Sequence, residues 1–377
     1  MGDSGTRPSN RERLAFVLWS GELGGAERHT VQVCRALRDD WGVDARVVFI
    51  GAPDRAEREL AEAGVPWCGM GLPRGRAVLS NERGLAQLVS ESGANGAFLV
   101  YGGYLARALR RGGYGAPLIS VEHGGILQLA SQPFLKRAKE EISRRFGERH
   151  LDATVCVSRF IEGVVRTHPH AHRLVTIYNG IDTGRYSPAL VPPQSGTCVF
   201  GLAGRLIEGK GVLHLVSSFE QRVGEVACSL AIAGAGPALE AAKRLAAQRG
   251  VSDSVHFLGV VDDMAEFWRA CSVVVQPTDG WIESFCLSLV EGMACGLPAI
   301  VSDQGALPEI LGEGCGAVVT PGDEQRLRAA MRRYATDPGL RLRDGECARE
   351  RSVETFDIHA TAGAYLRVLR EIAAARG

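Results

Sequence analysis

The stretch ESFCLSLVE, Glu283–Glu291, decides the fold class that the sequence predicts for this chain. It follows a short apolar run, Cys271–Gln276, and a turn-rich loop, Pro277–Ile282, so the pattern predicts a strand, a loop and a helix in succession. Ser284 is a favourable N-cap residue, and we therefore expect the helix to begin there and to end near Cys295.

The beginning of this helix is a candidate anion site. The backbone N–H groups of Phe285, Cys286 and Leu287 would lack partners within the helix, and the helix dipole favours a negative charge beside them. Glu283 would lie at the mouth of the site, and Glu291 about two turns along the helix. Two carboxylates beside a phosphate-sized group of donors suit a sugar nucleotide. The alternative interpretation is a pair of solvated acids.

The composition limits the class of protein. The chain has 377 residues, of which 45% are hydrophobic and 23% are charged, and this length suggests two domains. The formal net charge of zero argues against nucleic acid as the main partner. No run approaches the ~18 apolar residues of a membrane span. The polar segment Met1–Arg13 has no apolar signal-peptide core and is expected to be disordered, so we expect a soluble, cytoplasmic protein.

The ten cysteines are scattered, without a Cys-x-x-Cys motif or a zinc-like spacing. Several of them, such as Cys34, Cys156 and Cys271, lie within expected strands and helices. This pattern predicts reduced, buried thiols and no disulfide framework.

Apolar runs alternate with helical segments along both halves of the chain. Leu14–Trp19 is nearly continuous in apolar residues, as is typical of a parallel strand covered on both faces. A second alternation begins at about Cys198, after a segment rich in Pro, Gly and Asn, Tyr178–Gly196, that is typical of a linker. We therefore expect an α/β chain of two doubly wound, Rossmann-like domains. The expected domains are residues 14–187 and 188–357, with a helix at about 358–377 that packs back on the first domain.

Charged residues at expected strand ends are further candidates for a site. Gly204-Arg205 follows the first strand of the second half, and Lys210-Gly211 lies five residues further on, so the two cations could clamp a diphosphate. The alternative is a solvated pair on a loop. The spacing is not that of a Walker loop, because Gly and not Ser or Thr follows the lysine. His123 follows another expected strand, Pro117–Val121, and a structural and a functional role are equally open for it.

These motifs form an ordered set: Gly24-Gly25-Ala26-Glu27, Glu122-His123, Asn179-Gly180-Ile181-Asp182, Gly204-Arg205 with Lys210-Gly211, and Glu283-x7-Glu291. The set resembles the retaining nucleotide-sugar glycosyltransferases of glycosyltransferase family 4, which have the GT-B fold. Each motif is weak alone, but together they extend over nearly the whole chain.

The resemblance implies a role for each motif residue. Arg205 and Lys210 would neutralise the departing phosphate, and Glu283 would hold hydroxyls of the donor sugar. Glu291 would bind the two ribose hydroxyls, and His123 would contact the donor sugar near its C6 hydroxyl. The backbone amides of Gly24, Gly25, Phe285, Cys286 and Leu287 would bind the donor, with Asn179 as a further donor-binding residue. Family members often carry a smaller residue at Cys286, so the donor-sugar preference stays open there.

The resemblance also implies the substrates. The donor would be a nucleoside-diphosphate hexose, a UDP-sugar first and a GDP-sugar next, and the acceptor a hydroxyl of a small molecule, a glycan or a lipid-linked sugar. The chain contains no Asp-x-Asp motif, so we expect no metal and no other cofactor, and cationic side chains would stabilise the leaving phosphate. The alternatives are a sugar-nucleotide epimerase on the same fold and a non-catalytic nucleotide-sugar-binding protein.

A basic segment, Phe134–Lys139 with Arg144-Arg145, predicts an amphipathic helix in the first domain. It could contact an anionic membrane or an acidic acceptor. It could equally be a solvated face with ion pairs such as Lys136–Glu140, which is the interpretation that we favour. The sequence does not predict an oligomeric state.

Overall fold

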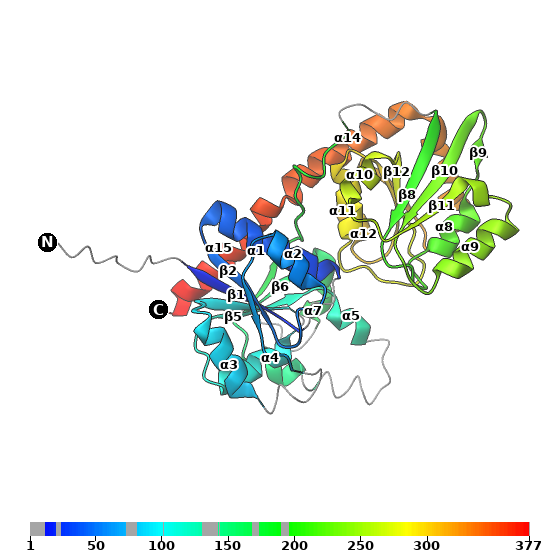
Figure 1. Ribbon diagram of the computed structural model, residues 1–377. Coiled ribbons are helices and arrows are strands. Elements are labelled where there is room, and N and C mark those ends of the chain that lie inside the picture. Colours follow the sequence, from blue (N-terminus) through cyan, green and yellow to red (C-terminus); the bar gives the residue numbers. More distant parts are fainter. Residues whose placement is uncertain are drawn as a thin grey trace. The chain divides into compact units, whose positions relative to one another are not determined.

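The computed structural model describes residues 12–19, 24–72, 81–100, 102–129, 142, 144–167, 173–189 and 196–376 (Figure 1). The expected N-terminal tail therefore lies almost entirely outside the described residues, except that Arg13 already belongs to the first strand. The basic segment Phe134–Lys139 also lies outside them.

The chain divides into two compact units, which are described separately. The first comprises residues 1–157, 162–180 and 358–377, and the second comprises residues 158–161 and 181–357. The division near Gly180 lies seven residues before the expected boundary. The physical reason is that Arg349 donates hydrogen bonds to the carbonyls of Thr183 and Tyr186, and Arg269 donates one to the carbonyl of Ser187, which binds this segment to the second unit.

The first unit is built on a parallel sheet with the strand order β3-β2-β1-β4-β5-β6-β7. Its central strands β1, β4 and β5 are short apolar runs that are buried on both faces, as the pattern at Leu14–Leu18 predicts, whereas the edge strands β3 and β7 are partly exposed. The strands are β1 (Arg13–Leu18), β2 (Asp44–Phe49), β3 (Trp67–Gly69), β4 (Gly96–Val100), β5 (Leu118–Glu122), β6 (Ala153–Cys156) and β7 (Leu174–Thr176).

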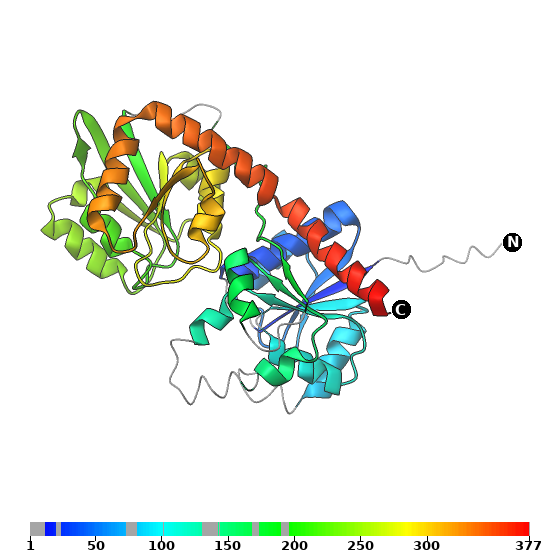
Figure 2. The same cartoon turned by 180° about the vertical axis from the view of Figure 1, so that it is seen from behind.

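Helices cover both faces of this sheet (Figure 1). They are α1 (Gly25–Trp41), α2 (Ala56–Glu62), α3 (Glu82–Glu91), α4 (Gly103–Arg111), α5 (Gly125–Leu129), α7 (Arg159–Arg166) and α15 (Ile358–Arg376). The C-terminal helix α15 lies beside α1 in this unit, as Figure 2 shows from behind. Gly363 of α15 permits this approach, because a Cβ there would lie 2.6 Å from the indole of Trp41.

The second unit has the sheet order β11-β10-β8-β12-β13-β14, with a short strand β9 antiparallel to β10. The strands are β8 (Thr197–Ala203), β9 (Arg222–Val223), β10 (Val226–Ala233), β11 (Val255–Gly259), β12 (Val273–Gln276), β13 (Ala299–Ser302) and β14 (Gly316–Val319). The helices are α8 (Val212–Ser218), α9 (Leu239–Gln248), α10 (Met264–Arg269), α11 (Leu287–Ala294), α12 (Leu307–Leu311), α13 (Glu324–Thr336) and α14 (Pro338–Thr355). Two units of this kind confirm the expected fold class.

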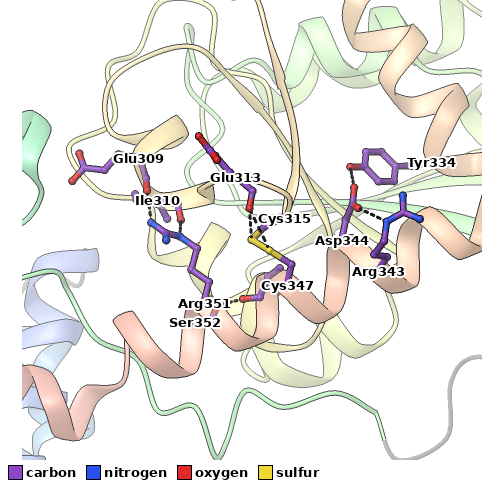
Figure 3. The surroundings of a disulfide bond; sticks show 11 residues. Glu309, Ile310, Glu313, Cys315, Tyr334, Arg343, Asp344, Cys347, Arg351 and Ser352 are labelled. Atoms are coloured by element: carbon purple, nitrogen blue, oxygen red, sulfur yellow. Dashed lines mark hydrogen bonds and ion pairs between the residues drawn. A yellow bond between two sulfur atoms is a disulfide. The ribbon is translucent and has the colours of Figure 1, made fainter.

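Two cysteines differ from the expectation of reduced thiols. Cys315, directly before β14, forms a disulfide with Cys347 of α14, and the two Cα atoms are 5.0 Å apart (Figure 3). The bond ties α14 to the edge strand of the sheet. The spacing of the two cysteines does not predict this disulfide. They are 32 residues apart in sequence and come together because α14 packs against β14. The other eight cysteines are free, as expected.

None of the described helices is both long and apolar enough to cross a membrane.

Candidate active site

The strand order of the second unit reverses between β8 and β12, which are neighbours in the sheet although two other strands of the main sheet, β10 and β11, lie between them in the chain. Ligands of open α/β sheets bind at such a point, beyond the carboxyl ends of the strands. Gln276, the last residue of β12, donates hydrogen bonds from Nε2 to the carbonyl of Ala203 (3.3 Å) and to Ser288 Oγ (3.1 Å). One side chain therefore joins the ends of both strands to the first turn of α11.

The two loops that leave these strand ends are bound to each other through Gly209. Its carbonyl accepts hydrogen bonds from the backbone N–H groups of Asp279 (3.0 Å), Gly280 (3.2 Å) and Trp281 (2.9 Å). Gly209 has a φ of 82°, and a Cβ at this position would lie 2.8 Å from the nitrogen of Trp281. Glycine is required here by both the backbone conformation and the close approach.

We predict that Gly209→Ala destabilises the second unit. The positive φ alone costs about 1–2 kcal/mol for a residue with a Cβ, and the contact with Trp281 adds to this cost. Gly224→Ala is the matched control, because Gly224 has a φ of 58° but no atom within 4 Å of the added Cβ. Urea unfolding should show a larger loss for Gly209→Ala than for the control. Equal losses would show that the loop contact contributes nothing.

The loops bring Lys210 and Glu283 together. Lys210 Nζ lies 2.9 Å from Glu283 Oε1, and the carboxylate side chain is only 10% exposed. The ammonium group also lies 5.7 Å from the centre of the Trp281 ring, within the range of a cation–π interaction. The backbone of Glu283 is fixed as well, because its carbonyl accepts a hydrogen bond from the N–H of Ala306 (2.9 Å). The sequence proposed a functional role for both residues but did not predict this ion pair.

The helix after Glu283 begins later than the sequence predicts. Its first residue is Leu287, Cys286 is the N-cap, and no side-chain cap is formed. Ser284 remains outside the helix, where its carbonyl accepts a hydrogen bond from Ser158 Oγ (2.8 Å). Phe285 packs edge-on against Phe356, with 5.7 Å between ring centres. The N–H groups without a partner inside the helix therefore start at the N-cap, one residue beyond Phe285.

Cys286 lies at this helix start as a neutral thiol. Its Sγ is 3.4 Å from Ser288 Oγ, and the residue is 5% exposed. Burial, followed by the charge of Glu283, raises the pKa of the thiol to about 12. A nucleophilic role is therefore excluded near neutral pH.

Arg205 follows β8 and is exposed, and its guanidinium group has no hydrogen-bond or ion-pair partner among the described residues. Glu291, in α11, is partly buried and has two protein donors. Its Oε1 accepts a hydrogen bond from Tyr186 Oη (3.1 Å), and its Oε2 accepts one from Trp268 Nε1 (3.4 Å). Sequence reasoning missed Tyr186 and Trp268, since neither belongs to a motif.

His123 belongs to the first unit, in the loop after β5. The preceding residue, Glu122, is 4% exposed, forms an ion pair with Arg144, and accepts hydrogen bonds from the N–H groups of Gly124 (2.9 Å) and Ile126 (3.3 Å). Glu122 therefore fixes the loop that presents His123. The sequence pattern favours a solvated basic face for Arg144. In the structure Arg144 forms two ion pairs, one with the buried Glu122 and one with Glu148 (3.0 Å).

The histidines near this loop are neutral. Burial lowers the pKa of His123 to about 4, and burial together with the charge of His123 lowers the pKa of His29 well below its usual range. The two rings are 6.0 Å apart. His29 Nε2 accepts a hydrogen bond from the N–H of Gly180 (3.0 Å), which requires an unprotonated nitrogen. Near neutral pH, His123 can therefore act as a hydrogen-bond partner but not as a cation.

The other predicted residues of the first unit are Gly24, Gly25 and Asn179. The N–H of Gly24 donates to Glu27 Oε2 (3.0 Å) at the start of α1, so this amide has a partner within its own helix turn. Asn179 is 4% exposed, and its Oδ1 has no hydrogen-bond partner within the part of the chain that the structure describes. In the second unit, the loops after β8 and β12 and the start of α11 thus contain Arg205, Lys210, Glu283, Phe285, Cys286 and Leu287, and Glu291 lies further along α11. The remaining predicted residues, His123, Gly24, Gly25 and Asn179, belong to the first unit. The described residues contain no cluster of three or more His, Cys, Asp or Glu that could hold a metal ion.

Comparison with known families matches both units. The model of the glycosyl transferases group 1 matches residues 192–351, and that of glycosyltransferase family 4 matches residues 23–185.

The chain is also similar to individual glycosyltransferases. The MMP alpha-(1->4)-mannosyltransferase of Mycolicibacterium hassiacum is 30% identical over 208 residues, which cover 52% of this chain and 48% of the relative. The D-inositol 3-phosphate glycosyltransferase of Streptomyces bingchenggensis is 34% identical over 141 residues, which cover 34% of this chain and 30% of the relative. The alignments thus span half or less of each relative.

A solved structure, Anabaena HepE in complex with UDP, superposes with a TM-score of 0.82 at 19% identity, over 96% of this chain and all of that one. At this identity the superposition shows a shared fold.

Proposed function

Because the chain belongs to the group 1 and family 4 glycosyltransferases, we propose that it transfers a hexose-type sugar from a nucleoside-diphosphate donor to an acceptor hydroxyl, with retention at the anomeric carbon. The main support is the set of groups at one end of the second unit. The guanidinium of Arg205, the ion pair of Lys210 with Glu283, and the start of α11 lie at the strand ends where α/β folds bind ligands.

The two cations suit the diphosphate of the donor. The Arg205 guanidinium is exposed and can form a bidentate contact with phosphate oxygens. The Lys210 ammonium has three N–H donors, of which the ion pair with Glu283 uses one. Together with the N–H groups of Cys286 and Leu287 at the start of α11, they would stabilise the charge that develops on the leaving phosphate. Our proposal therefore assigns no step to a metal ion.

The chemical step that we propose takes place on one face of the sugar. The bond between the anomeric carbon and the phosphate oxygen breaks, and the acceptor oxygen forms its bond to that carbon from the same side. The leaving phosphate oxygen takes the acceptor's proton, so charge and atoms balance. Glu283 would hold donor-sugar hydroxyls, and neutral His123 would exchange hydrogen bonds with a sugar hydroxyl without adding charge.

We further propose that the donor nucleotide is UDP, with GDP as the next candidate, and that Glu291 binds the ribose. HepE, which has the same fold, was solved with UDP. A thermal-shift panel of UDP, GDP, ADP and NAD on the wild type and on Glu291→Ala tests this proposal. A ligand at 100 times its dissociation constant adds about 2.7 kcal/mol to the free energy of unfolding.

We expect one nucleoside diphosphate to raise the melting temperature of the wild type but not of Glu291→Ala. Transfer or slow hydrolysis of the matching nucleotide sugar would then exclude a non-catalytic binding protein. Stabilisation by NAD alone, or by none of the four ligands, would contradict the proposed function.

A further inference from the structure

The Glu291 carboxylate is held by two donors that come from different parts of the second unit. Tyr186 lies in the segment that follows the division at Gly180, and Trp268 lies in α10. Each donor forms a hydrogen bond with a different carboxylate oxygen. Tyr186 Oη lies 3.1 Å from Oε1, and Trp268 Nε1 lies 3.4 Å from Oε2. Two donors on two oxygens fix the plane of the carboxylate as well as its position.

The indole of Trp268 is immobilised by its packing. It is fully buried, and its ring lies 4.8 Å from that of Phe267 in an edge-on contact. A Cβ on Gly292 would lie 3.2 Å from the indole, and one on Gly201 would lie 2.9 Å from it. Gly292 directly follows Glu291. Two adjacent residues of α11 therefore contact Trp268, Glu291 through its carboxylate and Gly292 through its close packing with the indole.

Tyr186 is immobilised through its backbone. Its N–H donates to the carbonyl of Asp182 (2.9 Å), and its carbonyl accepts a hydrogen bond from Arg349 (2.7 Å). Arg269 donates to the carbonyl of Ser187, the next residue. Burial, followed by the charge of Glu291, raises the pKa of the Tyr186 hydroxyl, so the hydroxyl stays protonated and remains a donor throughout the physiological pH range.

We propose that Tyr186 and Trp268 are positioning residues that orient the Glu291 carboxylate to accept hydrogen bonds from the two adjacent hydroxyls of the donor ribose. This inference rests on the proposed function, which assigns the ribose to Glu291. Each carboxylate oxygen can accept more than one hydrogen bond, so an oxygen that has a protein donor can also accept one from a ribose hydroxyl. A fixed carboxylate can meet two adjacent hydroxyls at once, whereas a rotating one must first lose side-chain entropy.

The test compares ribonucleotides with 2′-deoxyribonucleotides. We would measure dissociation constants of UDP and 2′-deoxy-UDP, and of GDP and 2′-deoxy-GDP, for the wild type and Tyr186→Phe. A hydrogen bond to a charged group contributes about 1.5–3 kcal/mol, and each 1.4 kcal/mol is tenfold in affinity. We therefore expect Tyr186→Phe to weaken binding of the ribonucleotide about tenfold, to reduce its advantage over the deoxy form, and to leave kcat at saturating donor nearly unchanged.

Tyr334→Phe is the matched control. Tyr334 is also a buried tyrosine whose hydroxyl donates to a carboxylate, Asp344 Oδ2, at 2.7 Å in the same unit, but neither residue belongs to the site (Figure 3). This variant should melt earlier and should keep the wild-type preference for the ribonucleotide. Trp268→Phe removes the other donor and supplies a second measurement of the same preference if Tyr186→Phe does not fold.

Different results would contradict the positioning role and the proposed function. If Tyr186→Phe weakens the ribonucleotide and its deoxy form equally, or keeps the wild-type preference, the positioning role is wrong while the donor site stands. If the wild type binds none of the four nucleotides, the proposed function itself fails.

Discussion

Arg205→Ala is expected to lower kcat by about 10²–10³, the usual effect of removing one donor that stabilises a developing negative charge. The side chain is exposed and has no partner among the described residues, so its loss should not disturb the fold. The expected signature is therefore a large loss of turnover with an unchanged melting temperature. Steady-state kinetics with saturating donor, together with thermal unfolding, measures both quantities.

Two further variants make this prediction specific. Arg205→Lys keeps the charge but loses the planar fork, and we expect partial recovery of kcat. Arg244→Ala removes another exposed arginine from α9 of the same unit and should leave kcat unchanged. Near wild-type turnover of Arg205→Ala at saturating donor would remove Arg205 from the chemical step.

Much of the fold could be predicted because the strands are short apolar runs between glycine-rich turns. The strand expected from about Cys198 to Ala203 corresponds to β8, Thr197–Ala203. The one expected at Cys271–Gln276 contains all of β12, Val273–Gln276, but starts two residues before it. The order of motifs along the chain also placed Arg205, Lys210 and Glu283 at strand ends, because loops that follow parallel strands meet at one edge of a sheet.

The remaining features depend on contacts between residues that are distant in sequence. Ser284 is a favourable N-cap locally, but the helix starts at Leu287 after an extended N-cap residue, Cys286, and the ring of Phe285 packs against Phe356, 71 positions further along the chain. Tyr186 lies 105 residues before Glu291, so no spacing rule could have linked them. The disulfide between Cys315 and Cys347 was missed for the same reason.

Removal of the ion pair between Lys210 and Glu283 is expected to lower both the stability and kcat. Lys210→Met leaves the Glu283 carboxylate, whose side chain is 10% exposed, without its cation. Breaking a buried pair by removing one partner costs about 3–5 kcal/mol, and partial exposure of the lysine side chain moves the expected cost to the lower end. We also expect kcat to fall by about 10²-fold or more, because one of the two cations that we propose for the leaving phosphate is lost. Urea unfolding and steady-state kinetics measure the two losses separately.

The double variant Lys210→Met/Glu283→Gln decides whether the pair acts on the substrate or only supports the fold. Neither side chain is then a buried unpaired charge, so we expect most of the lost stability to return. The activity should stay low, because both substrate contacts are gone. Recovery of activity together with stability would show that the pair is structural. Arg332→Met is the control for a surface pair. Arg332 Nε lies 2.5 Å from Glu220 Oε2 and the arginine side chain is 57% exposed, so its loss should cost much less stability than the loss of Lys210 and should leave kcat unchanged.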